Sequence, residues 1–116
     1  MYSYNSIEKL LSQQARTILS ANNNELFNQF EPQAEQIVLN KANVDKNNPP
    51  AWVKQPFVWI LEYLIQNQFT GKSPEYIDMI SERYKEAIKI LQEENNDIVI
   101  KSSKVGYYKN IYSGEF

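Results

Sequence analysis

Carboxylates are the side chains of this sequence whose type and placement come nearest to catalytic chemistry. Glu62 stands within the apolar run 57–65, which reads FVWILEYLI. Burial in such surroundings would favour the protonated carboxyl group, as a general acid requires. The alternative is that Glu62 faces solvent or pairs with a lysine, and this is the interpretation that we favour.

Two further pairs of carboxylates are spaced one helical turn apart. Glu31 and Glu35 form the first pair, and Asp78 and Glu82 form the second. Side chains four residues apart lie on the same face of a helix, so each pair could bind a hard cation. The commoner role of such a pair is to form a solvated face, and we favour that interpretation here.

The composition excludes most other catalytic chemistry. The chain has no histidine and no cysteine, so it contains neither a Ser–His or Cys–His nucleophile nor the usual nitrogen and sulfur ligands of zinc. Its three glycines, Gly71, Gly106 and Gly114, form neither a phosphate-binding loop nor a dinucleotide fingerprint. We therefore expect no enzymatic activity, no cofactor and no metal site.

The length and the charge distribution indicate one domain with a basic end. The 116 residues are 42% hydrophobic, which suffices for a single folded core. Residues 1–97 carry 9 Lys/Arg against 13 Asp/Glu, a balance of −4, whereas residues 98–116 carry three lysines against one glutamate, a balance of +2. The net charge of −2 gives no overall basic field for binding nucleic acid.

Neither a secretory signal nor a membrane span is expected. The N-terminal stretch MYSYNSIEKL lacks a charged region followed by an apolar one. The longest apolar run, at 57–65, is interrupted by Glu62 and is about half the length of a membrane span. The absence of cysteine removes any disulfide framework, so we expect a protein that is made in a cytosol.

The apolar period predicts helices along the first half of the chain. Ser6 is expected to cap a first helix that ends in the asparagines at 22–24, which tolerate the left-handed backbone. A short helical turn at 24–30 and then a helix with Pro32 in its first turn follow. The segment 43–50, NVDKNNPP, is a loop.

Two stronger helices are predicted in the second half. The segment after Pro56 is apolar nearly all round, so it is the central helix, with Pro56 either at a kink or in the first turn. Ser73 caps the next helix and Pro74 takes its first position. This helix buries a stripe that includes Ile80 and Leu91, and it is expected to end near residue 95.

The pattern changes after residue 97. Alternation from Ile98 to Ser102 predicts a strand, which cannot stand alone in water and must pair with another segment or another chain. Tyrosines favour protein interfaces, so we expect residues 98–116 to bind a protein partner. The expected partner-binding residues are apolar, aromatic or basic: Ile98, Ile100, Lys101, Lys104, Tyr107, Tyr108, Lys109, Tyr112 and Phe116.

The elements together predict a mainly α fold. We expect a small bundle of four to five helices over residues 1–97 and an extended or β C-terminal arm over residues 98–116. The alternation of lysine and tyrosine in this arm also resembles a stacking surface for single-stranded nucleic acid. The acidic body opposes such binding, so we favour a protein partner.

The order of these helices resembles that of a known family. The segments AEQIVLNKA, PPAWVKQPFVWILEYLI and SPEYIDMISERYKEAIKIL are similar to helices of the head–tail connector proteins of tailed bacteriophages, the adaptor or head-completion family that includes the Mu-type domain of unknown function. The resemblance covers residues 6–94. The sequence departs from the family at Gln36, where an acidic residue is common, and in its C-terminal arm.

The resemblance implies a structural virion protein in the neck of the particle. Such a subunit would form a ring, of the dodecameric kind, between the portal protein and the neighbouring connector or tail proteins. DNA would pass through the ring without specific binding. An arm donated to a neighbouring subunit makes a heterologous contact, which closes into a ring when the rotation allows. The alternative is a non-viral bacterial helical adaptor or regulatory protein that acts through protein–protein contacts.

Overall fold

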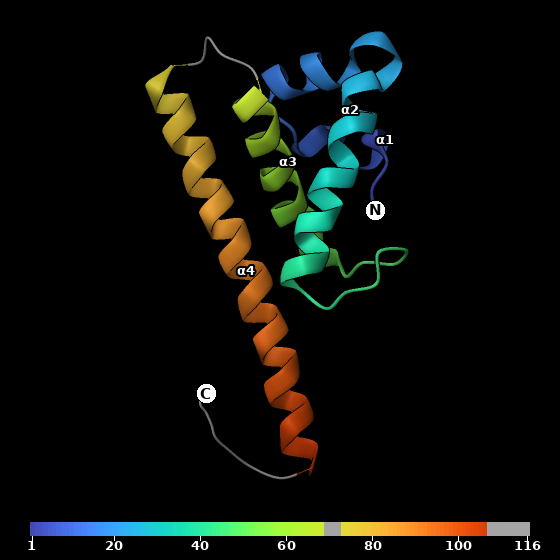
Figure 1. Cartoon of the computed structure of the whole chain (residues 1–116), viewed down its shortest axis with the longest axis vertical. Helices are drawn as coiled ribbons and strands as arrows, with labels where there is room; N and C mark the ends of the chain where they lie inside the picture. Colours follow the sequence, from blue (N-terminus) through green and yellow to red (C-terminus); the bar gives the residue numbers. More distant parts are fainter. Residues whose placement is uncertain (69–72, 107–116) are drawn as a thin grey trace.

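Helix α3 (Lys54–Gln68), the second of the three long helices described, is the centre of the fold. The computed structural model describes residues 1–68 and 73–106, with side chains described as far as residue 94. Helix α2 (Gln13–Lys41) packs on one side of α3, and α4 (Pro74–Gly106) packs on the other (Figure 1). Two short elements, α1 (Tyr4–Ile7) and η1 (Glu8–Leu10), precede α2, and η2 (Ala51–Val53) leads into α3. The predicted mainly α fold is confirmed.

Helix α3 is buried on most of its surface, as its composition predicted. Seven of its fifteen residues are buried: Pro56, Phe57, Val58, Ile60, Leu61, Glu62 and Ile65. Pro56 lies in the first turn, where the missing N–H would have had no partner within the helix. Of the two positions that the sequence left open for this proline, the first turn is therefore the one observed.

The start of α2 corrects the sequence prediction. Ser6 does not cap a long helix; its hydroxyl donates to the carbonyl of Ser3 at 2.8 Å. The backbone is extended at Leu11 and Ser12, and the Ser12 hydroxyl accepts from the Ala15 N–H at 3.2 Å. The helix therefore begins after Ser12, because Ser12 has the extended backbone that a helix cap requires.

A sharp bend divides α2 into two arms, at 13–20 and 25–41. Asn22, Asn23 and Asn24 all have left-handed backbone angles, with φ of 53°, 57° and 64°. Asparagine is one of the few residue types other than glycine that adopts this region readily. The predicted helix end at these asparagines is confirmed.

Pro32 lies inside the second arm and not in its first turn. The helix runs without interruption from residue 25 to 41, so the predicted division before Pro32 is wrong. The proline removes one backbone hydrogen bond, which would have come from residue 32 to the carbonyl of Asn28. Both residues are exposed, so water can satisfy this carbonyl and the helix tolerates the proline.

Helix α4 begins as predicted and ends later than predicted. The Ser73 hydroxyl accepts from the Tyr76 N–H at 3.1 Å, and Ile80, Ala87 and Leu91 are buried against the body. The backbone then stays helical through Gly106, so the strand predicted from Ile98 to Ser102 is not formed. Extending an existing helix is far less costly than starting one, which outweighs the β preference of a few branched residues. Residues 107–116 of the predicted arm lie outside the described residues.

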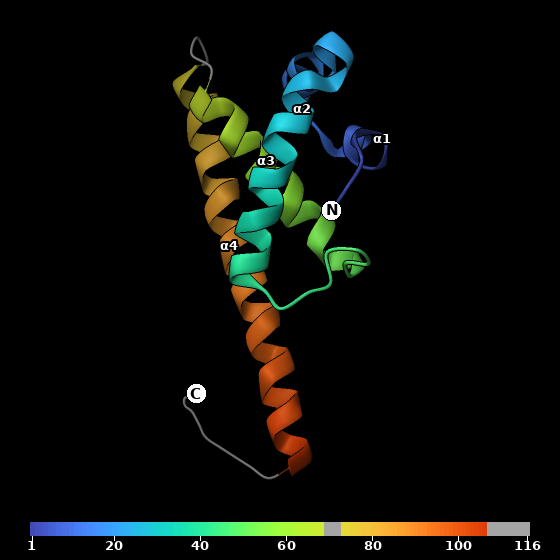
Figure 2. The ribbon, with the colours of Figure 1, turned by 45° about the vertical axis from the view of Figure 1, so that its right-hand side comes forward.

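The difference in length between α3 and α4 leaves the end of α4 projecting. Fifteen residues make α3 about 22 Å long, whereas the 33 residues of α4 extend about 50 Å. The two helices run antiparallel. The C-terminal turns of α4 therefore extend past the N-terminal end of α3 (Figures 1 and 2). The structure is therefore a helical body with a helical projection.

Candidate functional site

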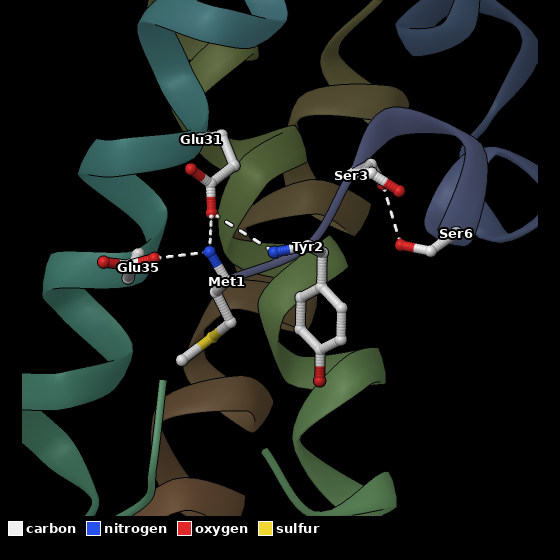
Figure 3. Close-up of polar contacts among 6 residues, drawn as sticks. All are labelled: Met1, Tyr2, Ser3, Ser6, Glu31 and Glu35. Carbon is white, nitrogen blue, oxygen red and sulfur yellow. Dashed lines mark hydrogen bonds and ion pairs between the residues drawn. The ribbon is translucent and has the colours of Figure 1, made fainter. Parts of the chain in front are cut away.

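The acidic pair Glu31 and Glu35 binds the amino terminus of the chain. The Met1 ammonium lies 2.8 Å from Glu31 Oε2 and 2.5 Å from Glu35 Oε1. The Tyr2 N–H also donates to Glu31 Oε2, at 3.4 Å. Figure 3 shows the Met1 nitrogen between the two carboxylates, which project from successive turns of α2.

Aromatic contacts hold the residues that follow Met1. The Tyr2 ring meets the Phe57 ring edge-on, with centroids 4.8 Å apart, and the Lys54 ammonium lies 5.8 Å from the Tyr2 centroid. The Tyr4 ring meets Phe27 in the same way at 5.7 Å. The N-terminal segment, residues 1–10, is thus fixed to both α2 and α3.

The two acidic pairs differ in their surroundings. Met1 is partly buried, and the Glu31 and Glu35 side chains are 15% and 21% exposed. The first pair therefore binds a cation that belongs to the chain itself, and it does not form the solvated face that the sequence favoured. In the second pair Asp78 is exposed, and Glu82 contacts Lys85 at 3.4 Å with both side chains more than 70% exposed. The solvated face is confirmed for this second pair.

The contact with Glu31 and Glu35 changes the proton affinity of the amino group. Burial alone would lower the pKa of the Met1 amino group, but hydrogen bonds to Glu31 and Glu35 and their negative charges outweigh burial. The pKa is therefore raised above its ordinary value of 8.0. A group whose pKa is raised by folding contributes stability that is fully present below the unfolded pKa and is lost as the pH rises through the folded one.

We expect the free energy of unfolding to fall as the pH rises above about 8, because the amino group of the unfolded chain then loses its proton while that of the folded chain still holds it. Chemical denaturation at about pH 7 and about pH 9.5 measures this change before most tyrosines ionise. The variant Glu31→Gln/Glu35→Gln is the matched control, since it keeps the amino group and removes both negative charges. Equal pH dependence in the two proteins would contradict the assignment.

Glu62 is buried and binds a backbone amide. Its side chain is 2% exposed, and its Oε2 accepts from the Ser12 N–H at 2.8 Å. Ser12 in turn caps α2 through its own hydroxyl. In a capping box a glutamate three residues into the helix returns a bond to the cap residue's N–H, and here Glu62 of α3 makes that bond from another helix.

The structure therefore corrects the favoured interpretation of Glu62. The residue neither faces solvent nor contacts a lysine among the described residues. Glu62 has a structural role, because its side chain accepts a hydrogen bond from the Ser12 N–H at the start of α2, which is the positive end of the helix dipole. The signal that sequence analysis missed was Ser12, whose own helix offers alanine where a capping box has glutamate.

The predicted partner-binding residues fall at or beyond the end of α4. Ile98, Ile100, Lys101 and Lys104 have helical backbone in the projection. The remaining members of the set lie outside the described residues: Tyr107, Tyr108, Lys109, Tyr112 and Phe116. Their role as a binding surface stays a prediction.

No family model, curated protein or solved structure matches the chain. Within the described residues, no group of three or more acidic, histidine or cysteine side chains could hold a metal ion. None of the helices described here has the length and apolar character needed to cross a membrane.

Proposed function

We propose that this protein is a structural adaptor, a subunit of the head–tail connector of a tailed bacteriophage. The subunit would form a ring with further copies of itself between the portal and the neighbouring connector or tail proteins. The observation that carries the proposal is the projection of α4 beyond the body that α2 and α3 form (Figure 1). The resemblance of residues 6–94 to this family supports the assignment to the phage connector.

A projecting helix suits an adaptor for a physical reason. The part of α4 beside α3 buries its apolar stripe, whereas the backbone of its last turns extends past α3 (Figures 1 and 2). A long helix without tertiary contacts is marginally stable in water, so contact with another molecule would stabilise it. When each subunit offers its projection to the next subunit, the contact is heterologous and repeats around a ring.

The charge distribution fits the same role. The body, residues 1–97, carries a balance of −4 and the arm carries +2, so an arm and a neighbouring body attract each other. A net negative body also disfavours retention of DNA, which must move through a connector.

Truncation after residue 97 is expected to abolish assembly while the helical body still folds. Light scattering and electron microscopy of the protein mixed with its assembly partners measure assembly, and circular dichroism with thermal melting measures folding. A full-length control with the surface change Lys85→Gln should assemble normally, since that side chain is exposed on the body. Normal rings from the truncated chain would contradict the proposal.

The other two functions predict different results in the same experiments. A non-viral helical adaptor would remain a monomer or dimer and would bind no phage portal. A nucleic-acid-binding protein would show affinity for single-stranded DNA that falls steeply with salt. Either result would replace the connector proposal.

A further inference from the structure

Three consecutive left-handed residues form the bend in α2. The φ angles of Asn22, Asn23 and Asn24 are 53°, 57° and 64°. Left-handed angles are costly for any residue that has a Cβ atom, and asparagine normally adopts them at single positions. A run of three is therefore strained, and it persists only where the surrounding structure imposes it.

The packing of the first arm of α2, residues 13–20, imposes the bend. No side chain at 22–24 makes a hydrogen bond within the described residues, so local bonds do not hold it. Ala15 and Leu19 of the first arm are 2% and 0% exposed. Just before this arm, the Ser12 N–H donates to Glu62 of α3 at 2.8 Å. The bend is the conformation that lets one chain make these contacts with its own body (Figure 1).

The apolar stripe of α2 keeps its phase across the bend. Leu19 before the bend and Phe30 after it are roughly three helical turns apart, so a straight helix would place both on one side. The stripe continues through Ala15 at one end and through Ala34 and Val38 at the other, and all five residues are buried. A straight α2 is therefore an amphipathic helix of 29 residues, about 43 Å long, whose two halves can pack on different bodies.

We propose that two copies of this chain exchange the first arm of α2. In the exchanged dimer α2 is straight, and residues 13–20 of each copy, with the segment that precedes them, pack on the body of the other copy. Each body regains the contacts that the bent chain makes, including the bond from Ser12 to Glu62, because an identical element replaces its own. This inference does not rest on the connector function, since truncation after residue 97 leaves the bend intact.

Two opposing effects set the balance between the bent monomer and the exchanged dimer. Straightening removes the left-handed backbone at 22–24 from both copies and turns it into helix. Association costs translational and rotational freedom, so the monomer prevails in dilute solution and the dimer increases with protein concentration. Asparagine suits this balance, because it tolerates the bend better than most residues and the helix better than glycine.

Substitution of all three asparagines separates the two states. Alanine favours helix and opposes positive φ, whereas glycine adopts positive φ freely and disfavours helix. The full chain with Asn22→Ala/Asn23→Ala/Asn24→Ala should therefore dimerise at least about a hundredfold more tightly than its matched control, Asn22→Gly/Asn23→Gly/Asn24→Gly. Analytical ultracentrifugation over a range of concentrations measures both dissociation constants. Equal constants would contradict the proposal.

A distance within one copy distinguishes arm exchange from any other association. The chain has no cysteine, so Gln14→Cys/Gln36→Cys adds two unique sites for spin labels, at exposed positions in the two arms. Labelled chains diluted into unlabelled ones report only this internal distance by pulsed electron spin resonance. In the alanine dimer the two backbone positions should be about 33 Å apart, the rise of a straight helix from residue 14 to residue 36, and closer in the glycine variant. A dimer with the same distance as the glycine variant would overturn the exchange.

If the alanine variant does not fold, the glycine variant is compared with the natural sequence. Glycine should weaken dimerisation at least about tenfold, because it stabilises the bend and destabilises the straight helix. A glycine variant that dimerises as tightly as the natural chain would overturn the proposal. So would a natural chain that remains monomeric at its highest soluble concentration.

Discussion

Replacing Phe57 by alanine is expected to lower the free energy of unfolding by about 3–5 kcal/mol, the usual cost of removing a buried phenylalanine ring. Phe57 is fully buried in the first turns of α3, the helix that contacts every other long element. Its ring also meets Tyr2 edge-on with centroids 4.8 Å apart, so the substitution removes an aromatic pair as well as packing. Denaturant unfolding followed by circular dichroism measures the change.

Two control variants separate packing from a general effect of mutation. Phe57→Leu retains most of the volume, so its cost should stay below about 1.5 kcal/mol. Met79→Ala changes a side chain that is 37% exposed on α4, and its effect should be within about 0.5 kcal/mol. A Phe57→Ala protein that is as stable as the Met79→Ala protein would show that α3 is not the centre of the core.

Sequence patterns predicted the positions of the helices correctly where local and tertiary preferences agree. The helix after Pro56 was predicted because apolar residues cover nearly its whole surface, and that composition leaves burial as the only stable arrangement. The start of α4 was predicted because Ser73 and Pro74 each fit their position for a local reason. The bend at Asn22 to Asn24 was also predicted for a local reason, because asparagine tolerates a left-handed backbone.

Local patterns failed where two signals of similar strength compete. Ser6 and Ser12 are both acceptable caps, and only the packing of Leu11 and the bond from Glu62 select Ser12. The β-branched residues after Asp97 favour a strand by propensity, whereas the long helix before them favours continuation. A single sequence window contains neither the tertiary contact nor the length of the preceding helix.

The favoured interpretation of the candidate site was wrong for its acidic pair. The spacing of Glu31 and Glu35 raised cation binding only as the less favoured alternative to a solvated face, and the structure places the Met1 ammonium between the two carboxylates. The cation itself could not be predicted, because the amino terminus lies about 30 residues away along the chain and reaches the pair only through the fold. Tyr2 was missed for the same reason, since its partners Phe57 and Lys54 are on α3.

The substitution Glu62→Leu is expected to destabilise the protein by about 1–3 kcal/mol, because it leaves the partly buried Ser12 N–H without its acceptor. The loss should be greatest at the start of α2, where Ser12 and Glu62 together replace the two bonds of a capping box. Amide exchange at residues 12–16, together with denaturant unfolding, measures both the local and the global effect.

The variant Glu62→Gln is the matched control for this prediction, because its amide oxygen can still accept from the Ser12 N–H. It removes the charge but keeps the acceptor, so it should be more stable than Glu62→Leu and should keep the start of α2 protected. The alternative is that the cost of burying a carboxylate exceeds the value of its bond, as occurs at some buried charges. In that case Glu62→Leu would equal or exceed the natural protein in stability, and Glu62 would not be what holds α2 to α3.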